Sequence, residues 1–121
     1  MRTKLVIGAV ALLFAAPAFA EESDFILTNE TGKAVKTVEL SPAGSGTWQP
    51  NKVDAELRRE SEVKAGGRTT VHFDKAGSQC KYDVKLTFAD DTSAVWSGIN
   101  LCDNSYITMR YKAGAPSFVA T

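Results

Sequence analysis

The chain has few of the residues from which enzyme and metal sites are usually built. Its 121 residues include one histidine, His72, and two cysteines, Cys80 and Cys102. A nucleophilic triad needs a general base beside its nucleophile, and no Gly-x-Ser-x-Gly sequence is present. Zinc and copper sites need several His or Cys ligands, more than this chain supplies if its cysteines pair. We therefore predict no enzymatic activity, no catalytic residues, no metal site and no cofactor.

The remaining titratable residues are also interpreted as surface residues and not as a catalytic or metal site. His72 alternates with apolar neighbours, which predicts a solvent-facing position on a strand. Asp90, Asp91 and Asp103 fall on expected turns and keep a calcium site or a carboxylate pair open as alternatives. No D-x-D-x-D-G spacing supports calcium. Charged turns are ordinary protein surface, so this alternative stays secondary.

A strong excess of charge of either sign is also lacking. The chain has 14 basic and 14 acidic residues. A protein that binds nucleic acid or an anionic membrane surface usually carries a basic field, because phosphate groups are neutralised by Lys and Arg. We therefore predict no nucleic-acid partner.

No apolar run is long enough for a transmembrane helix, which needs roughly 20 residues. The run from Leu5 to Ala16 is shorter, and it follows two basic residues and precedes Ala18-Phe19-Ala20. This order is typical of a secretory signal peptide with small residues before the cut. We expect residues 1–20 to be a signal peptide and residues 21–121 to be one domain, periplasmic or secreted, without membrane insertion after cleavage.

The clearest structural signal lies between the two cysteines. From Cys80 to Phe88, apolar and polar residues alternate strictly, as in a half-buried strand. Asp90-Asp91 supplies a turn, and an apolar second arm returns to Cys102. In an exported chain with only two cysteines, we predict a Cys80–Cys102 disulfide that closes this ribbon.

Further strands and turns flank the ribbon. Phe25–Glu30 and Ala34–Ser41 predict a first hairpin around Thr31-Gly32-Lys33. Pro42–Asn51 is rich in proline and glycine and predicts a loop, and Lys52–Lys64 has the spacing of at most one or two helical turns. Arg68–Asp74 and Ser105–Tyr111 predict two more strands. The tail, residues 112–121, has no periodicity and is predicted to be flexible.

These strands recur without a long helix between them, which predicts an all-β fold, an antiparallel β-sandwich of about six to eight strands. We expect a bulge at Ser97-Gly98, because the apolar residues after it fall out of phase with those before it. The predicted buried faces consist of Phe25, Leu27, Val38, Leu40, Val71, Phe73, Tyr82, Val84, Leu86, Phe88, Trp96, Ile107 and Met109.

Trp48 is the one residue for which we consider a role in binding. A tryptophan in a Gly/Pro-rich loop either folds back as a lid over the open end of the fold or stands at the surface as an anchor for a partner. The lid is the preferred interpretation and the anchor the alternative.

The sequence resembles a family of small exported bacterial proteins of unknown function. The matching positions are Phe25-x-Leu27-x-Asn29-x-Thr31-Gly32, Ser41-Pro42 with Trp48, Phe73 after the double glycine, Cys80-x-Tyr82-Asp83, Trp96 with Asn100-Leu101-Cys102, and Ile107-Thr108. Some proteins that resemble it carry the name argininosuccinate lyase, but those lyases are large helical tetramers. The resemblance therefore implies a fold and a compartment, and no reaction.

The leading functional hypothesis is a non-catalytic binding module of the periplasm or cell envelope. It would contact an envelope protein or ligand through a loop end made of Pro42–Glu62 with the turns at Asp90 and Asp103, because loops of such domains commonly carry function. One form would be an inhibitor of a periplasmic hydrolase. The alternative is a small-molecule or ion carrier with its ligand near Trp48, Tyr82 and Trp96.

Overall fold

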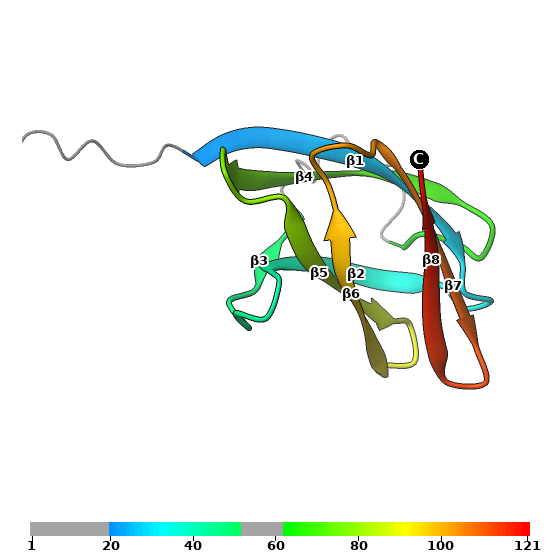
Figure 1. The fold of residues 1–121 in the computed structure, drawn as a ribbon. Helices are drawn as coiled ribbons and strands as arrows, with labels where there is room; N and C mark the ends of the chain where they lie inside the picture. The colour runs from blue at the N-terminus through cyan, green and yellow to red at the C-terminus, as the bar shows by residue number, and fades with distance from the viewer. Residues whose placement is uncertain (1–19, 52–61) are drawn as a thin grey trace, which may run out of the picture.

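The protein folds as two four-stranded β-sheets around one hydrophobic core, in a sandwich-like arrangement (Figure 1). The structure, a computed structural model, describes residues 20–51 and 62–121. The strands are β1 (Ala20–Glu30), β2 (Val35–Pro42), β3 (Gln49–Pro50), β4 (Arg68–Ala76), β5 (Lys81–Phe88), β6 (Ser93–Asn100), β7 (Tyr106–Lys112) and β8 (Ala115–Ala120). The predicted all-β fold is confirmed.

The order of strands is β4-β1-β7-β8 in one sheet and β3-β2-β5-β6 in the other. Every pairing is antiparallel except that of β1 with β7. The predicted first hairpin is wrong, because β1 and β2 lie in different sheets. The chain crosses from one sheet to the other at residues 31–34.

Asn29 explains why the chain crosses here instead of folding into a hairpin. Its side chain is fully buried, and its Nδ2 donates to the carbonyls of Lys33, Val63 and Lys64 at 2.8–3.1 Å. Its Oδ1 accepts hydrogen bonds from the amide and hydroxyl of Thr31. A buried amide with all these partners costs little to desolvate and fixes the local backbone. The crossing is therefore held by side-chain bonds that strand periodicity does not reveal.

All thirteen residues predicted to be buried lie in the core, with exposed fractions of 6% or less. The structure adds Val35, Ile99 and Leu101 to this set. The last two follow the predicted bulge, where the register of β5 with β6 shifts opposite Ser97-Gly98 and Gly98 takes a positive φ of 69°. The extra residue returns Ile99 and Leu101 to the core side. The bulge prediction is confirmed.

The ribbon between the cysteines forms as predicted. β5 and β6 pair, and Cys80 and Cys102 are joined by a disulfide with a Cα–Cα distance of 5.1 Å. At the other end Asp91 has a φ of 68°, and Phe88 donates its amide to the carbonyl of Thr92. This is the three-residue turn with a left-handed last position that joins many hairpins. A structural disulfide of this kind is typical of a non-reducing, extracytoplasmic environment.

The tail that was predicted to be flexible is instead strand β8. It pairs with β7 along its whole length through a two-residue turn, Ala113-Gly114, in which both residues have positive φ. This turn is not predictable from the sequence, because alanine is rarely found at a left-handed position. Pro116 is accommodated because β8 is an edge strand.

The predicted short helix falls mainly on residues 52–61, outside the described residues. Val63, near the end of that predicted segment, forms an antiparallel bridge with Val35. No helix occurs in the described ranges. Accordingly, none of their segments is a helix with the length and hydropathy for spanning a membrane.

Candidate functional site

The two sheets leave two lines along which their edge strands face each other. β3 lies next to β4 on one side of the molecule, and β6 lies next to β8 on the other. We call these lines the β3–β4 seam and the β6–β8 seam. They are closed by different side chains, and this difference defines the candidate site.

Side-chain amides close the β3–β4 seam. The Gln49 amide donates from Nε2 to the carbonyl of Asp74 at 3.0 Å and accepts the amide N–H of Asp74 at 2.9 Å. Asn51 Oδ1 accepts the amide N–H of His72 at 2.9 Å. These bonds occupy outward-pointing backbone groups of β4, as a neighbouring strand would. The edge of β4 is therefore capped at both residues.

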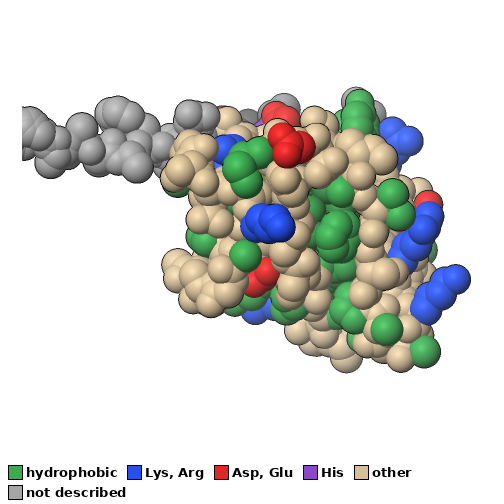
Figure 2. Space-filling view, viewed as in Figure 1, with side chains coloured by type: hydrophobic (Ala, Val, Ile, Leu, Met, Phe, Trp, Pro, Cys, Tyr) green, Lys and Arg blue, Asp and Glu red, His purple; other side chains and the backbone are tan. Residues whose placement is uncertain are grey.

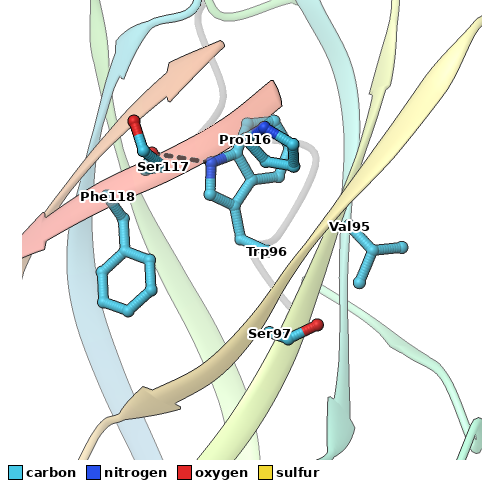
Figure 3. A pocket seen from close by; sticks show the side chains of 6 residues that line it. All are labelled: Val95, Trp96, Ser97, Pro116, Ser117 and Phe118. Atoms are coloured by element: carbon cyan, nitrogen blue, oxygen red, sulfur yellow. Dashed lines mark hydrogen bonds between the residues drawn. The ribbon is translucent and has the colours of Figure 1, made fainter. Parts of the chain in front are cut away.

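A single tryptophan bridges the β6–β8 seam. Trp96 is 1% exposed, and its indole Nε1 donates to the carbonyl of Ser117 at 2.8 Å and to that of Arg110 at 3.1 Å. Its ring also packs 5.8 Å from that of Tyr111. In Figure 3 the indole reaches from β6 across to β8. The bridge uses carbonyls of β7 and β8, and no side chain in the described part of the chain caps the facing edges of these sheets.

A surface groove follows this seam. It has a volume of about 430 Å³ and is lined by Val95, Trp96, Ser97, Pro116, Ser117 and Phe118. Figure 2 shows hydrophobic side chains gathered in a recessed strip on this face, with Lys and Arg side chains on either side. Val95 and Ser97 point to the opposite side of β6 from Trp96 (Figure 3).

Backbone groups of both edge strands point into the groove. Along β6, residues that bond to β5 alternate with residues whose backbone groups point outward. The hydrogen bonds between Phe88 and Thr92 and between Cys80 and Leu101 mark the bonded positions, so the N–H and C=O of Val95 point away from β5. In β8, the mutual bonds of Tyr106 with Thr121 likewise point the N–H and C=O of Phe118 away from β7. The groove thus combines apolar side chains with hydrogen-bonding backbone, a combination suited to a polypeptide.

The structure places Trp48 on the outer face of the β2–β5 pair. Its ring is half-buried, and the ammonium of Lys85 lies 4.9 Å from its centroid. Lys85 alternates with the core residues of β5 and is 3.8 Å from the carboxylate of Glu39. Whether Trp48 serves as a lid or as an anchor stays a prediction, but its contact is with the outer face of the sheet.

The three aromatic residues considered for a carrier site do not come together. Tyr82 and Trp96 are 1% exposed and face the core, while Trp48 lies against the opposite face of the same sheet. Tyr82 packs edge-on against Phe73 at 5.2 Å, and burial raises the pKa of its phenol. These contacts give Tyr82 a place in the core packing.

The acidic turns lie at opposite ends of the molecule, so the predicted loop end is wrong as a single surface. Asp103 follows β6 at the end that carries the 43–48 loop, whereas Asp90 follows β5 at the other end. Asp90 is 3.1 Å from Lys33, and hydrogen bonds from the hydroxyl and amide of Thr92 lower its pKa to about 2. Asp91 pairs with Lys36 and raises the pKa of that lysine through a hydrogen bond.

The described residues contain no group of three or more His, Cys, Asp or Glu side chains placed to hold a metal ion. His72 lies on the outer side of β4, with its Nδ1 3.9 Å from the carboxylate of Asp24. Its position on the polar side of a strand agrees with the sequence prediction.

Sequence reasoning missed the residues that distinguish the seams. The sequence pattern predicts a loop at Gln49 and Asn51 and a flexible tail at Phe118. A Gln-Pro-Asn stretch has no strand periodicity, and its role depends on β4, more than 15 residues away in the chain. Trp96 was correctly predicted to be buried, but its link to β8 could not be foreseen without β8.

The comparisons with known proteins bear on the fold alone. No protein family and no curated protein matches the sequence. Among solved structures, the NMR structure of a protein from Eubacterium rectale superposes with a TM-score of 0.53, over 83% of this chain and 88% of that chain. The sequence identity is 17%, so the similarity extends to the arrangement of strands.

Proposed function

We propose that this protein is a non-catalytic β-sandwich binding module of the periplasm or cell envelope, or a secreted one, and that it binds its partner along the β6–β8 groove. The observation that supports this proposal most strongly is the groove itself, which places an uncapped strand edge beside apolar side chains. Edge strands are usually covered or blunted in soluble proteins. An edge left accessible next to an apolar surface is therefore a candidate binding surface.

The disulfide between Cys80 and Cys102 supports an extracytoplasmic location, because such bonds persist in oxidising compartments. If the expected signal peptide is cut after Ala20, the pairing of β1 with β4 from Glu21 onward stays intact.

The filled core favours a binding surface over an interior carrier site. Side chains from both sheets, including Phe25, Phe73, Tyr82 and Trp96, pack in the space between them. The groove lies outside this space, at the β6–β8 seam. A hydrolase inhibitor would be one form of such a binding module.

Two exposed valines on edge strands provide a matched test. Val95 lines the groove and is 38% exposed, while Val119 is 43% exposed on the opposite, outer side of β8. Affinity capture from an envelope extract should recover a partner with the wild type and with Val119→Glu, and lose it with Val95→Glu. Equal recovery by both variants would contradict a role for the groove.

A further inference from the structure

We propose that the occupant of the groove is an extended peptide segment, flanked by acidic residues, that adds as a strand to the free edge of β6. This inference rests on the proposed function and specifies the chemistry of the partner. It depends on the backbone groups of β6, on the side chains beside them, and on two lysines of the neighbouring strands β5 and β7.

The edge of β6 offers hydrogen-bonding groups at strand spacing. Ser93 and Val95 are both at positions that do not bond to β5, so their N–H and C=O groups point outward. The bulge at Ser97-Gly98 then ends the regular edge, and Gly98 donates its amide to Asp83. An antiparallel or parallel segment can therefore pair with the first half of β6.

The other edges are less suited to strand addition. β4 is capped by Gln49 and Asn51, and β3 has two residues. On β8, Pro116 occupies one of the outward positions and has no N–H to donate. The regular part of β6 is thus the edge that best combines an open backbone with a neighbouring groove.

The side chains of the groove suit the alternating side chains of a strand. Pro116 and the half-buried Phe118 form a short apolar strip on one side of the added backbone, beside Trp96, which is 1% exposed and adds almost no accessible surface. Ser97 and Val95 lie on the other side of β6. Successive side chains of an added strand would point alternately to these two sides. Apolar residues are expected at the positions that face the strip.

The size of the groove favours a peptide over a second copy of the chain. A stable protein–protein interface buries about 800 Å² on each partner and involves about 20–30 residues a side. The groove has six lining residues. This footprint matches a short segment that gains most of its affinity from main-chain hydrogen bonds and a few side-chain contacts.

Two exposed lysines on the strands beside β6 and β8 favour acidic flanks. Lys81 lies on β5 opposite Asn100, and Lys112 lies on β7 opposite Ala115. Both lysines are exposed, and no carboxylate of the described residues lies within ion-pair distance of either one. The nearby Asp83 accepts the amides of Gly44 and Gly98. Acidic residues at the two ends of a bound peptide would complement these lysines.

The test uses ¹⁵N-labelled, disulfide-bonded protein and the peptide acetyl-Glu-Val-Thr-Val-Thr-Glu-amide, followed by NMR. We expect saturable shifts concentrated at the amides of Val95 and Phe118. Full N-methylation of the peptide removes its donors and should weaken binding about tenfold or more. Val95→Pro removes an outward N–H of the protein and should weaken binding of the unmodified peptide by a similar factor. Replacement of the flanking Glu residues of the peptide by Lys should also weaken binding.

The outcomes separate this inference from the proposed function. Equal binding of the N-methylated peptide would overturn strand addition while leaving the groove as a binding surface. If the same amides shift with protein concentration when no peptide is present, the occupant of the groove is a second copy of the chain. That result would overturn the proposal of a peptide. Absence of groove shifts at millimolar peptide would also overturn the inference, and the comparison of Val95→Glu with Val119→Glu would then decide the proposed function by itself.

Discussion

The two seams of this molecule join the edge strands of the two sheets through different side chains. Along the β3–β4 seam, Gln49 and Asn51 bond directly to outward backbone groups of β4. Along the β6–β8 seam, the indole of Trp96 bonds to carbonyls of Ser117 and Arg110, and the outward groups of β6 receive no such cap from residues 20–51 or 62–121. One seam joins the sheets and hides an edge, whereas the other joins the sheets and leaves an edge accessible.

This difference shows that holding two sheets together and covering their edges are separate tasks. A buried aromatic residue accomplishes the first through its packing area and through one indole N–H shared between two carbonyls. Side-chain amides accomplish the second because they carry a donor and an acceptor in nearly the geometry of a peptide group. A fold that uses the amides on one side and the aromatic residue on the other keeps one edge for association.

The largest effect should come from Trp96→Ala. Removal of a fully buried tryptophan should lower the free energy of unfolding by about 3–5 kcal/mol, a large share of the stability of a small domain. Urea unfolding of the two single variants would measure it. Trp48→Ala is the control, because its half-buried ring contacts Lys85 on the outer face, and we expect a cost of about 1 kcal/mol. Equal losses would show that Trp96 has no special part in closing its seam.

Removal of the disulfide should have the next largest effect and should act on one seam. Replacing Cys80 and Cys102 by serine should cost about 3 kcal/mol in the chain-entropy model, for a sequence separation of 22. Because the bond joins the ends of β5 and β6, amide exchange should accelerate in β6 more than in β4. Uniform acceleration in both strands would argue against a local effect.

Gln49→Ala tests the capped seam. The variant leaves the N–H and C=O of Asp74 without their Gln49 partners, and we expect a loss of about 1–3 kcal/mol together with concentration-dependent association through the exposed edge. Sedimentation velocity would detect the association. Gln49→Glu keeps an acceptor for the amide and should cause a smaller change. If the Gln49→Ala variant stays monomeric and fully stable, Gln49 does not cap the edge of β4.

The smallest effect concerns the turn between β5 and β6. The pKa of Asp90 is lowered from 3.8 to about 2 by its bonds to Thr92 and Lys33. The stability that these bonds contribute is therefore present above pH 4 and is lost as the pH falls towards 2. Since the carboxylate is exposed, the change should be slight, and it should be absent in Asp90→Asn. NMR titration of the carboxyl carbon would give the pKa directly.

Much of the fold could be predicted because strand alternation is a local signal. The core faces, the β5–β6 ribbon, its disulfide and the bulge at Ser97-Gly98 all follow from residues within one or two strands of each other. The crossing at Asn29 and the strand after Gly114 could not be predicted in this way. The first depends on bonds to residues 63 and 64, and the second on alanine in an unfavourable conformation.

The candidate site was less accessible to sequence reasoning for the same reason. Trp48 stood out because it is a large residue in a loop, yet it lies on the outer face of the sheet. The groove is made by β6 and β8, which are neighbours only after both sheets have formed. Surfaces of this kind depend on non-local contacts, which a single sequence does not record.

The claim on which this account depends is the unequal covering of the two seams, and amide hydrogen exchange measures it residue by residue. The account predicts slow exchange at His72 and Asp74, whose N–H groups donate to Asn51 and Gln49, and fast exchange at Val95 and Phe118, whose N–H groups point into the groove. Protection of Val95 and Phe118 equal to that of His72 and Asp74 would contradict it.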